Sequence, residues 1–258
     1  MQYAIKPRWE RDVVFKASTG IYQQPAFYRE MRDYNGVINK GIKAQTSYHF
    51  IIGSDYNFHI NDRGFKFITE MYYKYLENVI PYDMDNVRLR YYGVNNAKAY
   101  ATGVDFRVSG EFIKGEESWF SLSFLDTKED VEGDGRGYIR RPTDQKVTAG
   151  IFFQDHIPNN PTLKMYLNLV YGTGLPFGPP KSPQYRSQFS GPMYNRVDIG
   201  FSKLISFQDN ATRKHKSVES LWISLEVLNL LGASNTISYS WFKDYDSNQY
   251  AVPNTLST

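Results

Sequence analysis

Residues 47–58 read SYHFIIGSDYNF, and this stretch decides the fold that the sequence predicts. Apolar or aromatic side chains alternate in it with small or polar ones, namely Tyr48, Phe50, Ile52, Tyr56 and Phe58 with Ser47, His49, Gly53, Asp55 and Asn57. Successive side chains of a β-strand point to opposite faces of the sheet. The stretch therefore predicts a strand with one apolar face and one wetter face.

The same alternation recurs along the chain, most clearly at 100–112 and 163–172. It predicts about ten strands: 2–9, 13–22, 44–58, 65–76, 100–112, 119–125, 146–154, 163–172, 196–204 and 221–230. Residues 86–93 are expected to form a loop hairpin or a strand extension, and 236–242 to begin one more strand. A chain built almost wholly in this way, and rich in aromatic residues, indicates a sheet that faces lipid on one side and water on the other.

Composition narrows the class of protein. The 258 residues suffice for one large β domain or two small ones. Apolar residues make up 41% of the chain and the mean hydropathy is −0.52. No stretch approaches the ~20 consecutive apolar residues of a membrane-spanning helix, which excludes helical spanning but not a barrel. Aromatic residues reach 16%; Tyr and Trp favour membrane interfaces, although Tyr-rich strands also occur in soluble sandwiches and lectins.

Charge and cysteine content exclude several functions. The net charge of +3 is small and dispersed, so no nucleic-acid partner is expected. The absence of cysteine excludes a disulfide framework and thiolate chemistry. The start, MQYAIKP, has no charged segment followed by an apolar core, so no signal peptide is expected there. An exported form would then be a mature protein or a piece of a longer chain.

The connections between the expected strands alternate in length. Short links are expected at 59–64, 113–118 and 156–161, and long ones at 23–43, 77–98, 126–143 and 173–195. In an up-and-down sheet this alternation places every long loop at one end, as in outer-membrane barrels with short periplasmic turns and long extracellular loops. The long polar stretch 206–220 is the exception, because its position predicts a short turn.

No enzymatic motif is present, and neither catalysis nor a cofactor is expected. The four histidines lie far apart and have no metal-protease spacing. There is no G-x-S-x-G nucleophile motif and no Walker or Rossmann glycine pattern. The glycines of 171–180, YGTGLPFGPP, are interleaved with prolines and no helix follows, which argues against phosphate binding.

Two regions carry candidate binding residues. The acidic loop at 126–136 offers a cation site, since hard cations take carboxylate oxygens; its candidate ligands are Asp126, Glu129, Asp130, Glu132 and Asp134. The spacing does not fit an EF-hand, so the default expectation is a solvated loop with no metal. The basic run 213–216 is most simply a solvated turn.

The second region is a group of arginines beside a tyrosine. Guanidinium groups pair with phosphate in a bidentate way, so this group could meet an anionic ligand or lipopolysaccharide phosphate. The outer-loop ligand candidates are Arg136, Tyr138, Arg140, Arg141 and Phe177. Ordinary loop charges are the alternative interpretation.

Several stretches, taken in order, resemble one family. They are 11–28 (RDVVFKASTGIYQQPAFY), 99–112 (AYATGVDFRVSGEF), 171–180 (YGTGLPFGPP), 194–205 (YNRVDIGFSKLI) and 221–231 (LWISLEVLNLL) followed by 235–241. Together they are similar to TonB-dependent outer-membrane receptors, particularly the large Bacteroidetes branch. The resemblance covers most of the chain.

The resemblance implies an all-β, antiparallel, up-and-down transmembrane β-barrel of 22 strands with a plugged lumen in the bacterial outer membrane. Such receptors bind a scarce nutrient outside, such as a siderophore, cobalamin or oligosaccharide, and import it with energy relayed by TonB. The implied partners are outer-membrane lipid, the N-terminal plug, the remaining barrel strands, TonB, the ligand and a surface lipoprotein.

The sequence departs from the family pattern. Only about ten strands are expected, no plug or TonB box precedes them, and no final strand ends in an aromatic residue. We therefore expect residues 1–258 to be the C-terminal portion of a receptor barrel, without the plug and the final strand. An open sheet would leave two unpaired edges, which a bilayer cannot satisfy, so closure needs further strands.

Two alternatives stay open from the sequence alone. A smaller self-closed barrel, acting as a pore or an embedded enzyme, requires pairing of 13–22 with 221–230. A soluble β-sandwich binding module requires that the face of Tyr48, Phe50 and Ile52 packs against another sheet.

Overall fold

A computed structural model describes residues 1–85, 88–157, 160–206 and 220–256. The chain is all-β, as predicted, and every pair of neighbouring strands is antiparallel. The described residues include one short 3₁₀ turn, η1 (Pro183–Tyr185), and no α-helix. No helix in this part of the chain is long and apolar enough to span a membrane.

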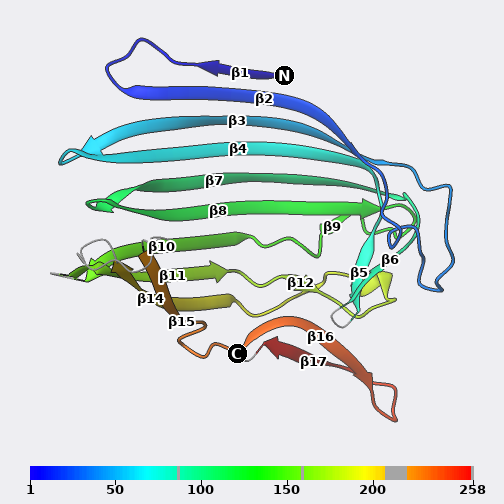
Figure 1. Ribbon diagram of the computed structural model, residues 1–258. Coiled ribbons are helices and arrows are strands. Elements are labelled where there is room, and N and C mark those ends of the chain that lie inside the picture. Colours follow the sequence, from blue (N-terminus) through cyan, green and yellow to red (C-terminus); the bar gives the residue numbers. More distant parts are fainter. Residues whose placement is uncertain (86–87, 158–159, 207–219, 257–258) are drawn as a thin grey trace.

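One large sheet dominates the molecule (Figure 1). Its strands follow one another in sequence order as β1 (Gln2–Ile5), β2 (Asp12–Gln24), β3 (Gln45–Ile60), β4 (Arg63–Val79), β7 (Ala97–Ile113), β8 (Glu116–Val131), β10 (Val147–Ile157), β11 (Asn160–Gly172), β14 (Tyr194–Ser206) and β15 (Ser220–Val227). The short β9 (Tyr138–Arg140) pairs with the end of β8. Each strand therefore pairs with its neighbours in the chain, which makes the sheet an up-and-down meander.

The large sheet is open within the described residues. Strand β2 pairs with β1 and β3, while β15 pairs with β14 at the opposite edge. The pairing of 13–22 with 221–230 that a self-closed barrel requires is not found there. The ten predicted strands are confirmed as segments, although β15 ends at Val227, short of the predicted residue 230.

Three two-stranded sheets lie outside the large one. They are β5 (Tyr82–Asp85) with β6 (Arg88–Tyr91), β12 (Pro176–Phe177) with β13 (Phe189–Ser190), and β16 (Asn235–Lys243) with β17 (Gln249–Leu256). The hairpin expected at 86–93 is thus β5–β6, displaced toward the N-terminus. The sequence did not predict β9, β12, β13 or β17.

The ends of the sheet differ as the alternation of links predicted. At the turn end, β3 and β4 pair up to Ile60 and Arg63, leaving a two-residue turn at Asn61 and Asp62. Both have positive φ, 49° and 61°, as the favoured hairpin turns require. The expected six-residue links shorten because strand pairing continues into the turns. The predicted turn at 206–220, with its basic run, lies almost wholly outside the described residues, as do 158–159 of the third short link.

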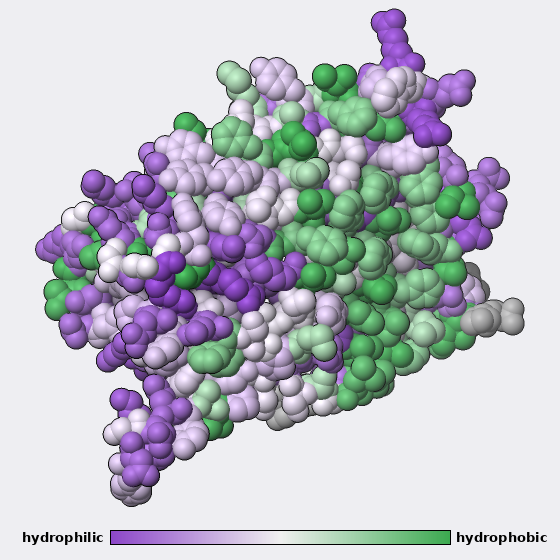
Figure 2. Space-filling view, turned by 180° about the vertical axis from the view of Figure 1, so that it is seen from behind, coloured by the Kyte–Doolittle hydropathy of each residue, from purple (hydrophilic) through white to green (hydrophobic). Residues whose placement is uncertain are grey.

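One face of the large sheet is apolar across all its long strands. The register places Ile52 opposite Met71 and Met71 opposite Val104, and the row continues through Phe124 to Val147. Figure 2 shows the hydrophobic side chains as a band, with hydrophilic ones gathered toward the loop end. Phe50 and Ile52 are 54% and 57% exposed. A β-sandwich would require a second sheet over this face, and none of the described segments covers it.

Aromatic residues border this apolar face at both ends. At the loop end, the rings of Tyr73 and Tyr100 stack at 6.4 Å and Tyr100 contacts Tyr138 at 5.4 Å. At the turn end, Phe58 and Phe65 stack at 5.6 Å. Ten residues separate Phe65 from Tyr75, about 34 Å along the strand. At a strand tilt of about 40° this equals about 26 Å across a bilayer, close to the apolar band of outer-membrane barrels.

The other face of the sheet is polar. Asp55 lies between Lys16 and Lys66, with each ammonium 2.7 Å from its Oδ2. Neighbouring rows carry Glu70 opposite Asp105, and Arg107, Arg196, Asp198 and Glu226 have the parity of this face.

The buried core lies at the loop end and not over the strands. Its apolar cluster is Val79, Ala97, Ala99 and Val131, with Leu76 packed against it. Glu129 and Asp144 are fully buried in the same region. Among the described residues, every buried apolar side chain except Phe65 lies at the loop end, which therefore has the larger interior.

Candidate functional site at the loop end

Two long connections and the end of strand β8 meet at one buried guanidinium group. Arg186 follows η1 in the connection between β11 and β14. Its Nε donates a hydrogen bond to Asp83 Oδ1 of β5 at 2.9 Å. Its Nη2 donates to Glu129 Oε1 of β8 at 2.5 Å and to the carbonyl oxygen of Tyr82 at 2.9 Å. Arg186 is only 4% exposed, so these contacts are made away from water.

Two tyrosines extend this network to the first long connection. Tyr34 Oη donates to Asp83 Oδ2 at 2.5 Å, and Tyr92 Oη donates to the same oxygen at 3.3 Å. Burial raises the pKa of Tyr34, and its hydrogen bond to Asp83 raises that pKa further. Tyr34 therefore stays protonated and keeps donating well above neutral pH.

Charges balance inside the network. Arg141 Nε lies 3.3 Å from Glu129 Oε2, so two guanidiniums face the carboxylates of Asp83 and Glu129. Burial lowers the pKa of Arg186, but Glu129 and Asp83 outweigh that effect and hold the pKa above its ordinary value. Buried charges of this kind are stable only when paired and hydrogen-bonded.

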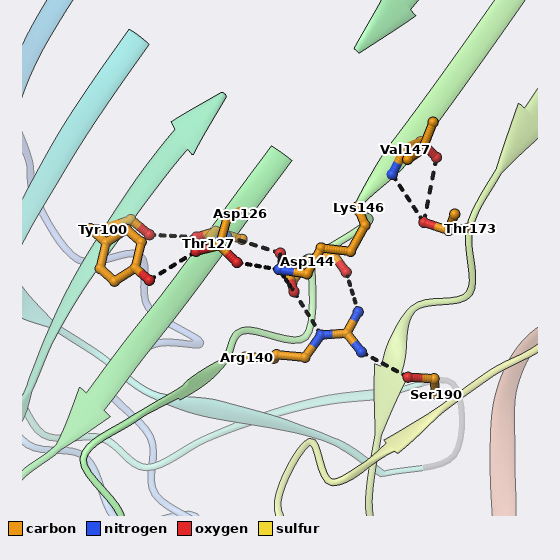
Figure 3. Close-up of polar contacts among 9 residues, drawn as sticks. All are labelled: Tyr100, Asp126, Thr127, Arg140, Asp144, Lys146, Val147, Thr173 and Ser190. Atoms are coloured by element: carbon orange, nitrogen blue, oxygen red, sulfur yellow. Dashed lines mark hydrogen bonds and ion pairs between the residues drawn. The ribbon is translucent and has the colours of Figure 1, made fainter. Parts of the chain in front are cut away.

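A second balanced network surrounds Asp144 (Figure 3). The fully buried Asp144 accepts hydrogen bonds from Arg140 Nε at 2.6 Å and from the backbone N–H of Thr127 at 2.9 Å. Lys146 pairs with both Asp144 and Asp126. Arg140 Nη1 also donates to Ser190 Oγ at 2.7 Å, which ties β9 to β13.

The outer-loop arginines predicted to meet an anion point inward. Arg140 and Arg141 pair with Asp144 and Glu129, as described above. Arg136 Nη1 donates to the carbonyl oxygens of Pro183 and Arg186, at 2.9 and 2.8 Å. The structure thus places all three in contacts that hold loops together, and binding of an external anion stays a prediction. Tyr138, the first residue of β9, is 45% exposed at the loop end.

The acidic loop predicted at 126–136 is in part a strand, which corrects the sequence interpretation. Strand β8 continues through Val131 because 126–131 pair with β7 and 128–130 also pair with β9. Alternation then sends Asp126 and Asp130 to one face and Glu129 to the other. Asp134 Oδ1 accepts the backbone N–H of Arg136, and Glu132 donates its own N–H to Asn96. Within the described ranges, no three such side chains are placed to hold a metal ion.

Phe177 lies at a cavity of about 390 Å³ that β16 lines in part. Its ring stacks on Tyr239 at 3.8 Å with an interplanar angle of 12°, and Trp241 lies 6.1 Å away. The glycines of the YGTGLPFGPP stretch permit this packing. A Cβ at Gly174 would lie 1.8 Å from the carbonyl oxygen of Gly191, and one at Gly178 would lie 2.3 Å from that of Tyr185.

The sequence predicted Phe177 as a candidate but not the aromatic residues that pack against it. Tyr239 and Trp241 belong to a strand predicted only as a beginning, and Arg186 stood in a proline-rich loop without a pattern. No local signal joins these residues, because the fold brings them together from separate connections. No protein-family model matches this chain, and no curated protein matches it.

Proposed function

We propose that this chain is the C-terminal part of the barrel of a TonB-dependent receptor that imports a scarce nutrient across the bacterial outer membrane. One observation carries the proposal: a wide meander presents an uncovered apolar face, bordered by aromatic residues at both ends, opposite a charged face. Lipid is the environment that such a face suits, and water inside a barrel suits the other.

Energetics support a lipid environment. Burying a large apolar side chain is worth about 1.5–3 kcal/mol, and this face exposes such side chains on β2, β3, β4, β8, β14 and β15. The largest apolar patch on an ordinary soluble monomer covers about 300–600 Å². A face that extends from β2 to β15 goes well beyond a scattered surface patch.

The open edges support a partial barrel. As far as the described residues show, strand β15 and most of β2 have unpaired backbone groups on their outer sides, and a bilayer cannot hydrogen-bond them. Further strands and a plug from the remainder of the receptor would satisfy these groups and the charged face. The tied loops would then stand on the outside, where a nutrient arrives, while TonB and a surface lipoprotein would act through other parts.

Cysteine labelling tests the proposal directly, because the chain has no native cysteine. Val104→Cys and Asp105→Cys are adjacent on β7 but face opposite sides. With an environment-sensitive fluorophore in lipid vesicles, position 104 should be quenched by a lipid-borne quencher and position 105 by aqueous iodide. The same alternation is expected for Leu122→Cys and Ser123→Cys.

Two results would overturn the proposal. One is equal access of iodide to all four labels in the presence of lipid. The other is stable, monomeric folding of the 258 residues in plain buffer. The apolar face would then need no lipid, and the open edges would need no further strands.

A further inference from the structure

The cavity beside Phe177 is lined without any charged side chain. Its volume of about 390 Å³ falls within the range of small-ligand pockets. The lining is mainly apolar, from Met84, Pro142, Val170, Leu175, Pro176 and Phe177, with Tyr194, Tyr239 and Trp241 supplying aromatic surface. Gln145, Thr173, Thr236 and Ser238 are its few polar side chains.

Next to this cavity is a void of about 20 Å³ that Arg186 lines. The two spaces share five lining residues, Met84, Pro142, Pro176, Phe177 and Gly178. Nη1 of Arg186 is buried and has no hydrogen-bond partner among the described residues, whereas its Nε and Nη2 are engaged. A buried donor without a partner is destabilising, so an acceptor oxygen at this point would be stabilising.

The surroundings set the charge of that acceptor. The carboxylates of Asp83 and Glu129 already balance the guanidiniums of Arg186 and Arg141. An added anion would leave this buried region with a net negative charge and incomplete compensation. The free N–H therefore favours a neutral oxygen, such as a hydroxyl, ether or carbonyl.

We propose that the cavity beside Phe177 binds an uncharged ring compound whose apolar face lies against the aromatic side chains and whose acceptor oxygen reaches Arg186 Nη1. A neutral pyranose has this chemistry, with C–H faces and acceptor oxygens on one ring. The proposal rests on the proposed function in that the loop end faces the external medium. A single water in the small void is the competing occupant, since that void is large enough for one.

The test uses the receptor that contains these 258 residues, in detergent micelles, and methyl β-D-glucopyranoside as the probe. Saturation-transfer NMR should show contact to the ring C–H protons, and glucuronate, its anionic counterpart, should bind at least about tenfold more weakly. Phe177→Ala should weaken glucoside binding by up to about tenfold through lost stacking. Gly191→Val should abolish binding, because Gly191 lines the cavity and the added side chain would occupy part of it. The fold should tolerate the change, since a Cβ at Gly191 meets only ordinary contacts of 3.4 and 3.6 Å.

Tyr138→Ala is the matched control, since it removes an exposed aromatic ring of the same loop end that does not line the cavity. It should leave glucoside binding unchanged. A crystal structure with the glucoside should place a sugar oxygen on Arg186 Nη1.

Three results would overturn the inference: no transfer to the glucoside, equal binding by Gly191→Val, or a crystal structure with only a water in the void. The fluorophore pattern on β7 and β8 is independent of this cavity. A lipid-facing wall without sugar binding would reject the inference alone, and sugar binding by a chain without a lipid-facing wall would reject the proposed function alone.

Discussion

The large sheet from β1 to β15, called the wall below, and the loop end of this molecule are held together in opposite ways. In the wall, backbone hydrogen bonds join neighbouring strands while apolar side chains such as Ile52 remain more than half exposed. At the loop end the backbone is less regular, and buried side chains such as Arg186 and Glu129 join segments that lie far apart in the chain. The wall therefore requires a surrounding medium for its apolar side chains, whereas the loop end buries its side chains against one another.

The largest expected effect is at the loop end. Arg186→Met would leave Asp83 and Glu129 buried without their main cation, which costs about 3–5 kcal/mol for a buried pair broken on one side. Hydrogen exchange should show lost protection at β5, β6 and the connection between β12 and β13, with unchanged protection in the strands near the turns. Arg63→Met, which removes an exposed hydrogen bond to Phe112 at the turn end, is the control and should change little. Uniform loss of protection over the whole sheet would contradict the separation of the two regions.

The next largest effect is expected from a charge on the apolar face of the wall. Leu122→Arg places a charge midway along β8 on the apolar face, where it should destabilise the protein by about 2–4 kcal/mol in lipid. Ser123→Arg puts the same side chain one residue further on, on the polar face, and should cost less than about 1 kcal/mol. Denaturant unfolding in phospholipid vesicles measures both. Equal destabilisation by the two variants would refute a lipid-facing wall.

The smallest effect concerns alkaline pH. Burial and then the hydrogen bond to Asp83 raise the pKa of Tyr34 in the folded state. A raised folded pKa means that the stabilisation is complete below the unfolded value of about 10 and is lost as the pH rises above it. Limited proteolysis of the loop end should therefore accelerate above about pH 10, with the turn end unaffected. Tyr34→Phe should cost about 1 kcal/mol at neutral pH and remove Tyr34's share of the alkaline step; an undiminished step would assign it to other groups.

The sequence predicted the wall better than the loop end for a physical reason. A strand with two different faces leaves a period-two record in its own residues, and 163–172 falls inside β11 as the structure has it. Residues 126–131 are mostly charged and predicted a loop, yet pairing with β7 and β9 makes them strand. Their charges are tolerated because Glu129 meets Arg186 and Asp126 meets Lys146, contacts that no local pattern reveals. Phe177 was predicted as a ligand candidate from its loop, but its cavity depends on the distant Tyr239 and Trp241.

The contacts of Arg186 also imply an order of assembly. Each hairpin of the wall joins segments that are adjacent in the chain, so its loop-closure cost is small and strands can be added one after another. Arg186 instead meets Asp83 across 103 positions and Glu129 across 57. If strands are added in chain order, Asp83 and Glu129 are positioned before the connection that carries Arg186. We expect the loop end to close last, so its protection would report that the strands between β4 and β14 have assembled in the correct register.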